Sequence, residues 1–155
     1  MGGIEASAFA QAMRQWLWLY PSVEIVHLFG IAILVGSIAV LDLRLLGISR
    51  SLSVRRLASH VLPWTLASFA LIVPSGFAMF VAHASDLISN PVFALKLSLV
   101  GLAGVNAAVF HTGVFRSAGN WDIDVPPPPG ARAAAAFSLV IWISVIACGR
   151  LLAYT

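Results

Sequence analysis

Charged residues are scarce in this chain. Of its 155 residues, only 10% are Asp, Glu, Lys or Arg, whereas 60% are hydrophobic, and the mean hydropathy is +0.95. A soluble domain has about 25% charged residues, so this chain has too few charges to cover a surface that faces water. The composition therefore excludes a soluble globular protein. It predicts one integral membrane domain over residues 1–155, with the lipid bilayer as its main partner.

Cysteine is also nearly absent. The single Cys148 excludes an internal disulfide, and it excludes metal and iron–sulfur sites that need several cysteines. The net charge of +3 comes from arginines near the expected membrane edges, so we expect no nucleic-acid partner. Residues 1–20 lack the basic start and apolar core of a signal peptide.

Long apolar segments are abundant. The 17 residues between Glu24 and Asp42 carry no formal charge, and they would extend about 26 Å as a helix, close to the hydrocarbon thickness of a bilayer. Three further segments share this character, and Pro63 and Pro74 predict bends in the longest of them. The sequence thus predicts an all-α, integral membrane four-helix bundle with up-down topology. Its spans are expected at residues 23–47, 57–85, 91–115 and 133–154.

The segments that flank the spans have patterns of their own. Residues 5–20 combine apolar and aromatic residues at helical spacing with polar ones, which predicts an amphipathic helix lying in the membrane interface. Pro21 is then expected to turn the chain into the first span. Before the last span, the run Pro126–Pro129 predicts a stiff, extended segment that ends at Gly130.

Basic residues are unevenly divided between the two sides of the predicted bundle. Six of the nine lie in or beside the first and third connections between spans. These six are Arg44, Arg50, Arg55, Arg56, Arg116 and Arg132. Because Lys and Arg favour the cytoplasmic side, we expect a bacterial inner-membrane protein with both termini in the periplasm.

Ionisable residues within the spans fall at two depths. With each uncharged stretch centred on the midplane, His27 and Lys96 lie about 10 Å towards the outside, and Asp42 and His111 about 12 Å towards the inside. The intervals His27–Asp42 and Lys96–His111 are both 15 residues, which returns each pair to nearly one helix face. We therefore expect two polar levels around a shared interior. The outer level contains Glu24, His27, Lys96 and Arg150, and the inner level contains Asp42, Arg44, Asn106 and His111.

Two interpretations account for these levels. Charged groups cost about 2.5–3.5 kcal/mol each at the centre of a membrane helix, so they need partners or a function. In the first interpretation, the carboxylates and cations of each level form ion pairs between helices, and the histidines fill hydrogen-bonding positions. In the second, the levels bind haem b, which needs neutral imidazole inside an apolar wall and cations for its propionates.

The haem interpretation predicts one or two haem b groups. His27 is the first candidate iron ligand and His111 the second, about 22 Å apart along the bundle. His83 would complete the outer site, as would Lys96 or Met79, and His60 would complete the inner one. Both His60 and His83 fall at headgroup level, where a histidine also serves as a wetted surface group.

The remaining polar residues of the two levels would support these ligands. Lys96 and Arg150 would hold propionates, and Glu24 would orient His27. Asp42 would orient His111 in the same way. Arg44 and Asn106 complete the expected set of cofactor-binding residues.

The order of motifs VEIVHLFG … DLRLLG … PVFALKLSLVGLAGVNAAVFH … GRLLAY resembles a family of four-helix bacterial inner-membrane proteins of unknown function, over nearly the whole chain. More distantly, it is similar to HemJ-type protoporphyrinogen oxidases and to copper-resistance D-like membrane domains. Positions that match the oxidase pattern are His27, Gly36, Arg44-Leu45 and Lys96-Leu97. This resemblance implies haem b binding with His27 and Lys96 in the functional set. Asp42, Asn106 and His111 depart from the pattern and leave the substrate open.

Together these features predict a haem b protein that transfers electrons within or across the inner membrane. If it is an enzyme, it is a membrane oxidoreductase, with a quinone, a porphyrinogen or a redox protein as its partner. Ala32-x-x-x-Gly36 offers a small-residue face for a homo-oligomer. The alternative is a non-catalytic membrane subunit or a small transporter in which both polar levels are structural.

Overall fold

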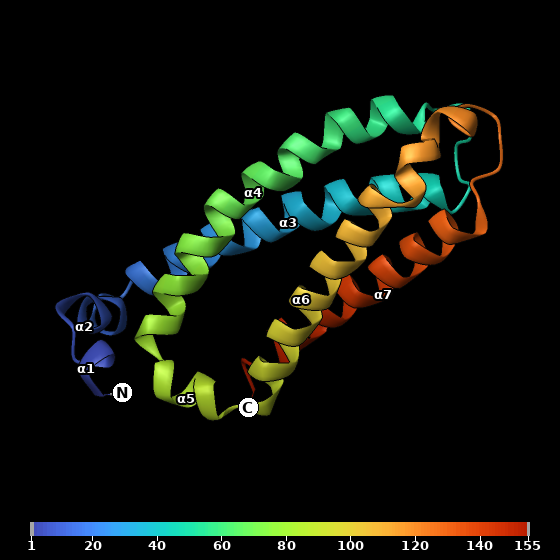
Figure 1. Ribbon diagram of the computed structural model, residues 1–155. Coiled ribbons are helices and arrows are strands. Elements are labelled where there is room, and N and C mark those ends of the chain that lie inside the picture. Colours follow the sequence, from blue (N-terminus) through green and yellow to red (C-terminus); the bar gives the residue numbers. More distant parts are fainter. Residues whose placement is uncertain (1, 155) are drawn as a thin grey trace.

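The computed structural model describes residues 2–154, and all the elements in this part of the chain are helical (Figure 1). Four helices are long and apolar enough to cross a membrane: α3 (Leu19–Leu45), α4 (Val54–Ala82), α6 (Pro91–Thr112) and α7 (Pro129–Leu151). The short elements are α1 (Gly2–Glu5), α2 (Ala8–Gln15), α5 (Ala84–Ser89) and the 3-10 helix η1 (Val114–Asn120). The structure thus confirms an all-α bundle of four apolar helices.

The bundle consists of two helical hairpins. Helix α3 packs along α4, and α6 packs along α7, while contacts of α7 with α3 join the hairpins (Figure 1). Helices α4 and α6 meet through the stacked rings of Phe80 and Phe93, whose centroids lie 5.9 Å apart. The two ends of the described chain and α5 lie at one end of the bundle, here named the terminal end. The connections 46–53 and 121–128 lie at the opposite end, named the loop end (Figure 1).

The first membrane helix starts earlier than the sequence predicted. Helix α3 begins at Leu19 rather than at residue 23, and Pro21 lies inside its first turn. A proline is tolerated there because a first-turn N–H has no partner within the helix. The interfacial segment is also not one helix over residues 5–20. The side chain of Ser7 caps a separate helix, α2, by accepting a hydrogen bond from the Ala10 N–H at 3.2 Å.

The other spans differ from prediction at their ends. Helix α7 begins at Pro129 rather than at residue 133, because the fixed backbone angle of proline suits the first position of a helix. The extended proline run is therefore one residue shorter than expected. Helix α4 begins at Val54 rather than at residue 57, since Ser53 caps it. Helix α6 ends at Thr112 rather than at residue 115, and η1 follows.

The longest helix is bowed. Helix α4 contains both Pro63 and Pro74, and Figure 1 shows it curving along its length. This agrees with the bend predicted from the two prolines, each of which lacks a backbone N–H donor.

The middle of the bundle is filled with hydrophobic side chains. Helices α3, α6 and α7 contribute the buried cluster Leu34, Ala103, Ile141, Trp142 and Val145. Outside this core the apolar residues are largely exposed, and only 6% of the most apolar stretch of α6 is buried within the chain. Such exposure suits helices that face lipid tails rather than water.

The N-terminal helices dock on the terminal end of α4. The Glu5 carboxylate accepts hydrogen bonds from the backbone N–H and the hydroxyl of Ser85, both at 2.7 Å. Arg14 donates to the Ala82 carbonyl at 2.8 Å, and Met13 is buried beside the same turn. These contacts hold α2 against the terminal end of α4, with Trp16, Leu17 and Trp18 exposed beside it.

Two glycines of α3 provide a matched test of the packing between α3 and α4. A Cβ at Gly30 would lie 2.8 Å from Cγ1 of Ile72 and 3.1 Å from Cβ of Leu71. We expect Gly30→Ala to lower the free energy of unfolding by about 1–3 kcal/mol, because α4 must move away. The control is Gly36→Ala, at a position with no neighbour within 4 Å. It should leave stability unchanged or raise it by up to about 1 kcal/mol through helix propensity. Unfolding in mixed micelles measures both, and equal effects would contradict the packing described.

Candidate functional site

All four membrane helices contribute residues to one level near the terminal end, around His27. The His27 ring is half-buried on α3, and its Nδ1 lies 2.9 Å from the Ser75 hydroxyl and 3.2 Å from the Ile72 carbonyl of α4. Its Cε1 lies 3.1 Å from the position that a Cβ on Gly76 would occupy. The absence of a side chain at Gly76 therefore allows the imidazole to approach α4 this closely.

The hydrogen-bond network defines the tautomer of His27. The Ser75 hydroxyl donates its single proton to backbone carbonyls of its own helix, at Leu71 or Ile72. Ser75 Oγ and the Ile72 carbonyl therefore both accept, and the His27 Nδ1 is the donor. In this tautomer Nε2 carries a lone pair.

Lys96 of α6 lies at the same level. Its side chain is half-buried, and its Nζ is 3.5 Å from the position of a Cβ on Gly149 of α7. Lys96 interacts electrostatically with the buried Cys148, and its charge also acts on His27. The structure thus brings His27 and Lys96 together, in agreement with their predicted common depth.

The other two residues of the outer level do not join this group through hydrogen bonds. Glu24 is exposed, and although its charge acts on His27, the ring is held by Ser75 and Ile72 instead. Arg150 is also exposed, and it donates to the Tyr154 hydroxyl at 2.7 Å. The Glu24 charge acts on His27 while α4 supplies the hydrogen-bond acceptors of Nδ1, so a role of Glu24 in orienting the ring stays a prediction.

His111 occupies the corresponding position near the loop end. Its Nδ1 donates to the Ala107 carbonyl at 2.9 Å, since a carbonyl can only accept. Its Nε2 is buried and has no hydrogen-bond partner. The rings of Phe110 and Phe115 each lie 5.2 Å from the imidazole, centre to centre. His111 therefore has the same tautomer as His27, inside an aromatic wall.

The polar residues near His111 use other partners. Asp42 is only 6% exposed, and its carboxyl interacts with the Ser138 hydroxyl of α7 while Oδ2 has no partner. Asn106 donates to the Ala134 carbonyl at 3.0 Å, one turn along α7 from Ser138. Because Oδ2 of Asp42 and Nε2 of His111 both lack partners, they do not bond to each other. The prediction that Asp42 orients His111 is wrong.

The Arg44 side chain forms hydrogen bonds with backbone carbonyls of the two connections at the loop end. It is 2% exposed, and its guanidinium donates to the carbonyls of Leu52 at 2.7 Å, Asp122 at 2.8 Å and Arg50 at 3.1 Å. No ion pair between Arg44 and Asp42 forms within residues 2–154. The side chain instead connects the two loops, with acceptors at residues 50 and 52 in one loop and at residue 122 in the other.

His60 and His83 are not brought next to the two central histidines. His60 is exposed on α4. His83 packs edge-on against the Tyr20 ring, with centroids 5.4 Å apart. It follows Gly76 by seven residues, or about 10 Å along the helix, so it lies further out than His27.

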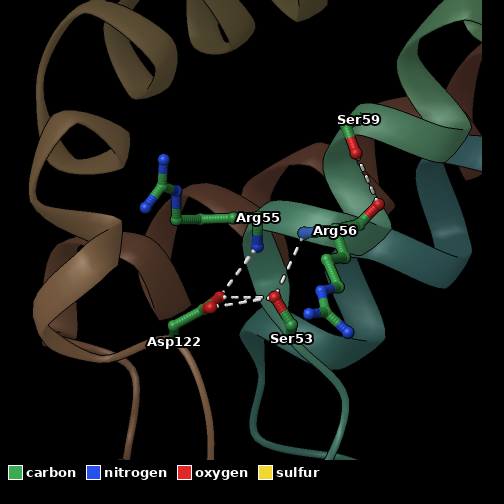
Figure 2. A pocket seen from close by; sticks show the side chains of 5 residues that line it. All are labelled: Ser53, Arg55, Arg56, Ser59 and Asp122. Atoms are coloured by element: carbon green, nitrogen blue, oxygen red, sulfur yellow. Dashed lines mark hydrogen bonds between the residues drawn. The ribbon is translucent and has the colours of Figure 1, made fainter.

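A polar hollow of about 340 Å³ lies at the start of α4 (Figure 2). The Asp122 carboxylate faces the first turn of α4 and accepts from the Ser53 hydroxyl at 2.8 Å and from the Arg55 N–H at 2.9 Å. The side chains of Arg55 and Arg56 extend away from it on either side (Figure 2). Asp122 thus serves as an anionic cap for α4.

This cap predicts a dependence of stability on pH. Burial raises the pKa of Asp122, but hydrogen bonds from Arg55 N–H and Ser53, together with the charge of Arg55, outweigh it and hold that pKa below its ordinary value. The carboxylate therefore stabilises the fold above the pKa of the unfolded chain, and this contribution is lost as the pH falls through the lower folded pKa. We expect Asp122→Asn to flatten the acid side of the stability curve, measured by thermal unfolding in detergent between neutral and acidic pH. The control Asp86→Asn, at an exposed position in α5, should leave the curve unchanged. Equal acid sensitivity of wild type and Asp122→Asn would contradict the cap.

Three functional positions escaped the sequence prediction. Ser75 and Gly76 form the surface that holds His27, and Asp122 closes the loop end. The pair Ser75-Gly76 is visible beside Pro74 in the sequence, but only the register of α3 against α4 shows that it meets His27. Ser53 is recognisable in the sequence as a helix cap because it precedes a long helix. Its partner Asp122 lies 69 residues away, so the sequence does not show that the two meet.

These features define a multi-pass membrane protein built from two helical hairpins, with the half-buried His27 towards the terminal end and the half-buried His111 towards the loop end. The chain belongs to a family of unknown function, DUF6644, whose sequence profile matches residues 11–155. No curated protein and no solved structure gives a significant match. The comparisons therefore show this family and do not show the resemblance to the oxidases.

Proposed function

We propose that this protein binds haem b and transfers electrons within or across the membrane. The single observation that carries the proposal is the shared state of His27 and His111. In each, a backbone carbonyl accepts from Nδ1–H, which directs a lone pair to Nε2. This second hydrogen bond is what fixes the orientation of histidine ligands in metal sites.

The residues around both histidines fit a haem ligand. Nε2 of His111 is a buried acceptor without a donor, which costs free energy unless another group binds to it. At His27, Gly76 and Ser75 hold the ring in place, and Lys96 supplies a positive charge nearby. The donor set does not indicate a polynuclear metal site, since no group of three or more His, Cys, Asp or Glu exists within residues 2–154.

A haem at His27 and a haem at His111 would occupy two separate positions. The packed cluster around Leu34 and Trp142 lies between the two levels, so a group at His27 and one at His111 would be separate. Lys96 would hold a propionate beside His27, and Phe110 and Phe115 would exclude water beside His111. Bound haem supplies an iron that accepts and returns one electron.

The orientation and partners follow from the same proposal. The arginines at the loop end favour a cytoplasmic loop end and a periplasmic terminal end in a bacterial inner membrane. The electron partner would be a quinone, a porphyrinogen or a redox protein that reaches one of the two levels. Exposed Gly36 beside Ala32 would allow a second copy to pack against α3.

The test is an absorbance spectrum of protein purified in mild detergent from cells supplied with a haem precursor. We expect a Soret band, sharpened α and β bands after reduction, and one or two haems per chain. A colourless protein with full helical content would contradict the proposal. It would instead favour a non-catalytic subunit or a small transporter, in which the histidines only fill hydrogen-bonding positions.

A further inference from the structure

The carboxyl of Asp42 is one of the buried polar groups that lack hydrogen-bond partners in the described chain. It lies where α3 meets α7, the contact that joins the two hairpins, and it is only 6% exposed. This carboxyl interacts with the Ser138 hydroxyl of α7, and its Oδ2 is buried without any partner. Ser138 is itself 8% exposed, so both sides of the contact are shielded.

No positive charge compensates Asp42. On its own helix, Arg44 turns to the loop carbonyls. The ionisable groups at the loop end of the packed elements also have other surroundings: His60, Arg55 and Arg56 of α4 and Arg132 of α7 are exposed, and His111 of α6 bonds to Ala107. No charged group acts on Asp42 within the described chain. A carboxylate buried in this way costs several kcal/mol or more, far above the cost of a neutral carboxyl with one hydrogen bond.

We propose that Asp42 and Ser138 form a proton-binding site between the two hairpins. In the occupied state, one proton bonds to the carboxylate to give a neutral carboxylic acid, which shares a hydrogen bond with Ser138. In the empty state, the proton has left and one negative charge remains on Asp42. The ligand is a proton rather than a metal ion, because a metal ion needs several more oxygen or nitrogen ligands than this site offers. The site is independent of haem and goes beyond the function proposed above.

Infrared spectroscopy of the whole protein in lipid nanodiscs tests this site. At neutral pH, we expect the wild type to show the carbonyl stretch of a buried carboxylic acid, which shifts on exchange into D₂O. The band should be absent from Asp42→Asn, which preserves the shape of the side chain. It should remain in Asp86→Asn, whose carboxyl lies in an exposed part of α5.

A second variant keeps the proposal falsifiable if Asp42→Asn fails to fold. Ser138→Ala retains the acid but removes its hydrogen-bond partner, so the band should move to higher frequency without losing intensity. The absence of any acid band in the wild type would overturn the proposal. So would a band that Asp42→Asn and Ser138→Ala both leave unchanged, or one that sodium ions at neutral pH convert to a carboxylate signal.

Discussion

Replacement of His27 by alanine is expected to remove the Soret band of the haem that we propose at the terminal end. Because the His27 Nδ1–H donates to Ser75 and Ile72 of α4, Nε2 is the ring atom left to act as a ligand. Loss of an axial ligand should lower haem content at this level by more than about tenfold, since even outer hydrogen-bond partners of ligands change affinity by about 10–100-fold. Haem per chain, measured after extraction into pyridine, gives the result.

The neighbouring glycine tests the orientation of the same ring without removing it. In Gly76→Val, the new side chain begins 3.1 Å from Cε1 of His27 and must displace the imidazole. We expect a loss of haem close to that of His27→Ala, with helical content unchanged. Gly101→Val is the matched control, because nothing lies within 4 Å of that position. If both valine variants keep the full haem content, the contact between His27 and α4 does not hold the ligand.

Replacement of Arg44 by leucine is the second large effect, and it concerns stability. The side chain makes three hydrogen bonds to carbonyls of two separate loops, and it is almost fully buried. Its removal leaves three acceptors in a shielded place, so we expect a loss of about 4 kcal/mol in the free energy of unfolding. Unfolding in mixed micelles, followed by circular dichroism, measures this loss.

The geometry of the guanidinium can be separated from its charge. Arg44→Lys keeps the charge but cannot reach three carbonyls from one rigid fork, so it should recover less than half of the lost stability. Arg56→Leu, at an exposed position in α4, should stay within about 0.5 kcal/mol of the wild type. The same stability in Arg44→Leu and Arg56→Leu would show that the loops do not depend on Arg44.

Helix number, type and approximate depth could be predicted because the bilayer imposes them. Uncharged stretches of bilayer length identified all four spans, and the same depth count placed His27 level with Lys96. The helix ends were less predictable, because caps determine them locally. Pro129 at the first position of α7 and Pro21 within the first turn of α3 both lie in helices that the sequence predicted to begin later.

The partners of the polar residues could not be predicted from depth alone. Arg44 and Asp42 are two residues apart on one helix, so their side chains point about 160° apart around the axis. One reaches the loops and the other reaches α7, and no pair between them forms. For His27, the acceptors are the Ile72 carbonyl and the Ser75 hydroxyl. Every residue has a backbone carbonyl and serines are common in membrane helices, so the sequence does not mark these two as partners of a histidine.

The most direct test of the account is an electron paramagnetic resonance spectrum of the oxidised protein with ¹⁵N-labelled histidine. The central claim is that Nε2 of His27 carries an available lone pair for iron. We expect a haem iron signal whose nitrogen hyperfine coupling changes when ¹⁴N histidine is replaced by ¹⁵N histidine. In His27→Ala, the part of this signal that comes from the terminal end should disappear. A spectrum without haem iron, or one that His27→Ala leaves unchanged, would contradict this claim.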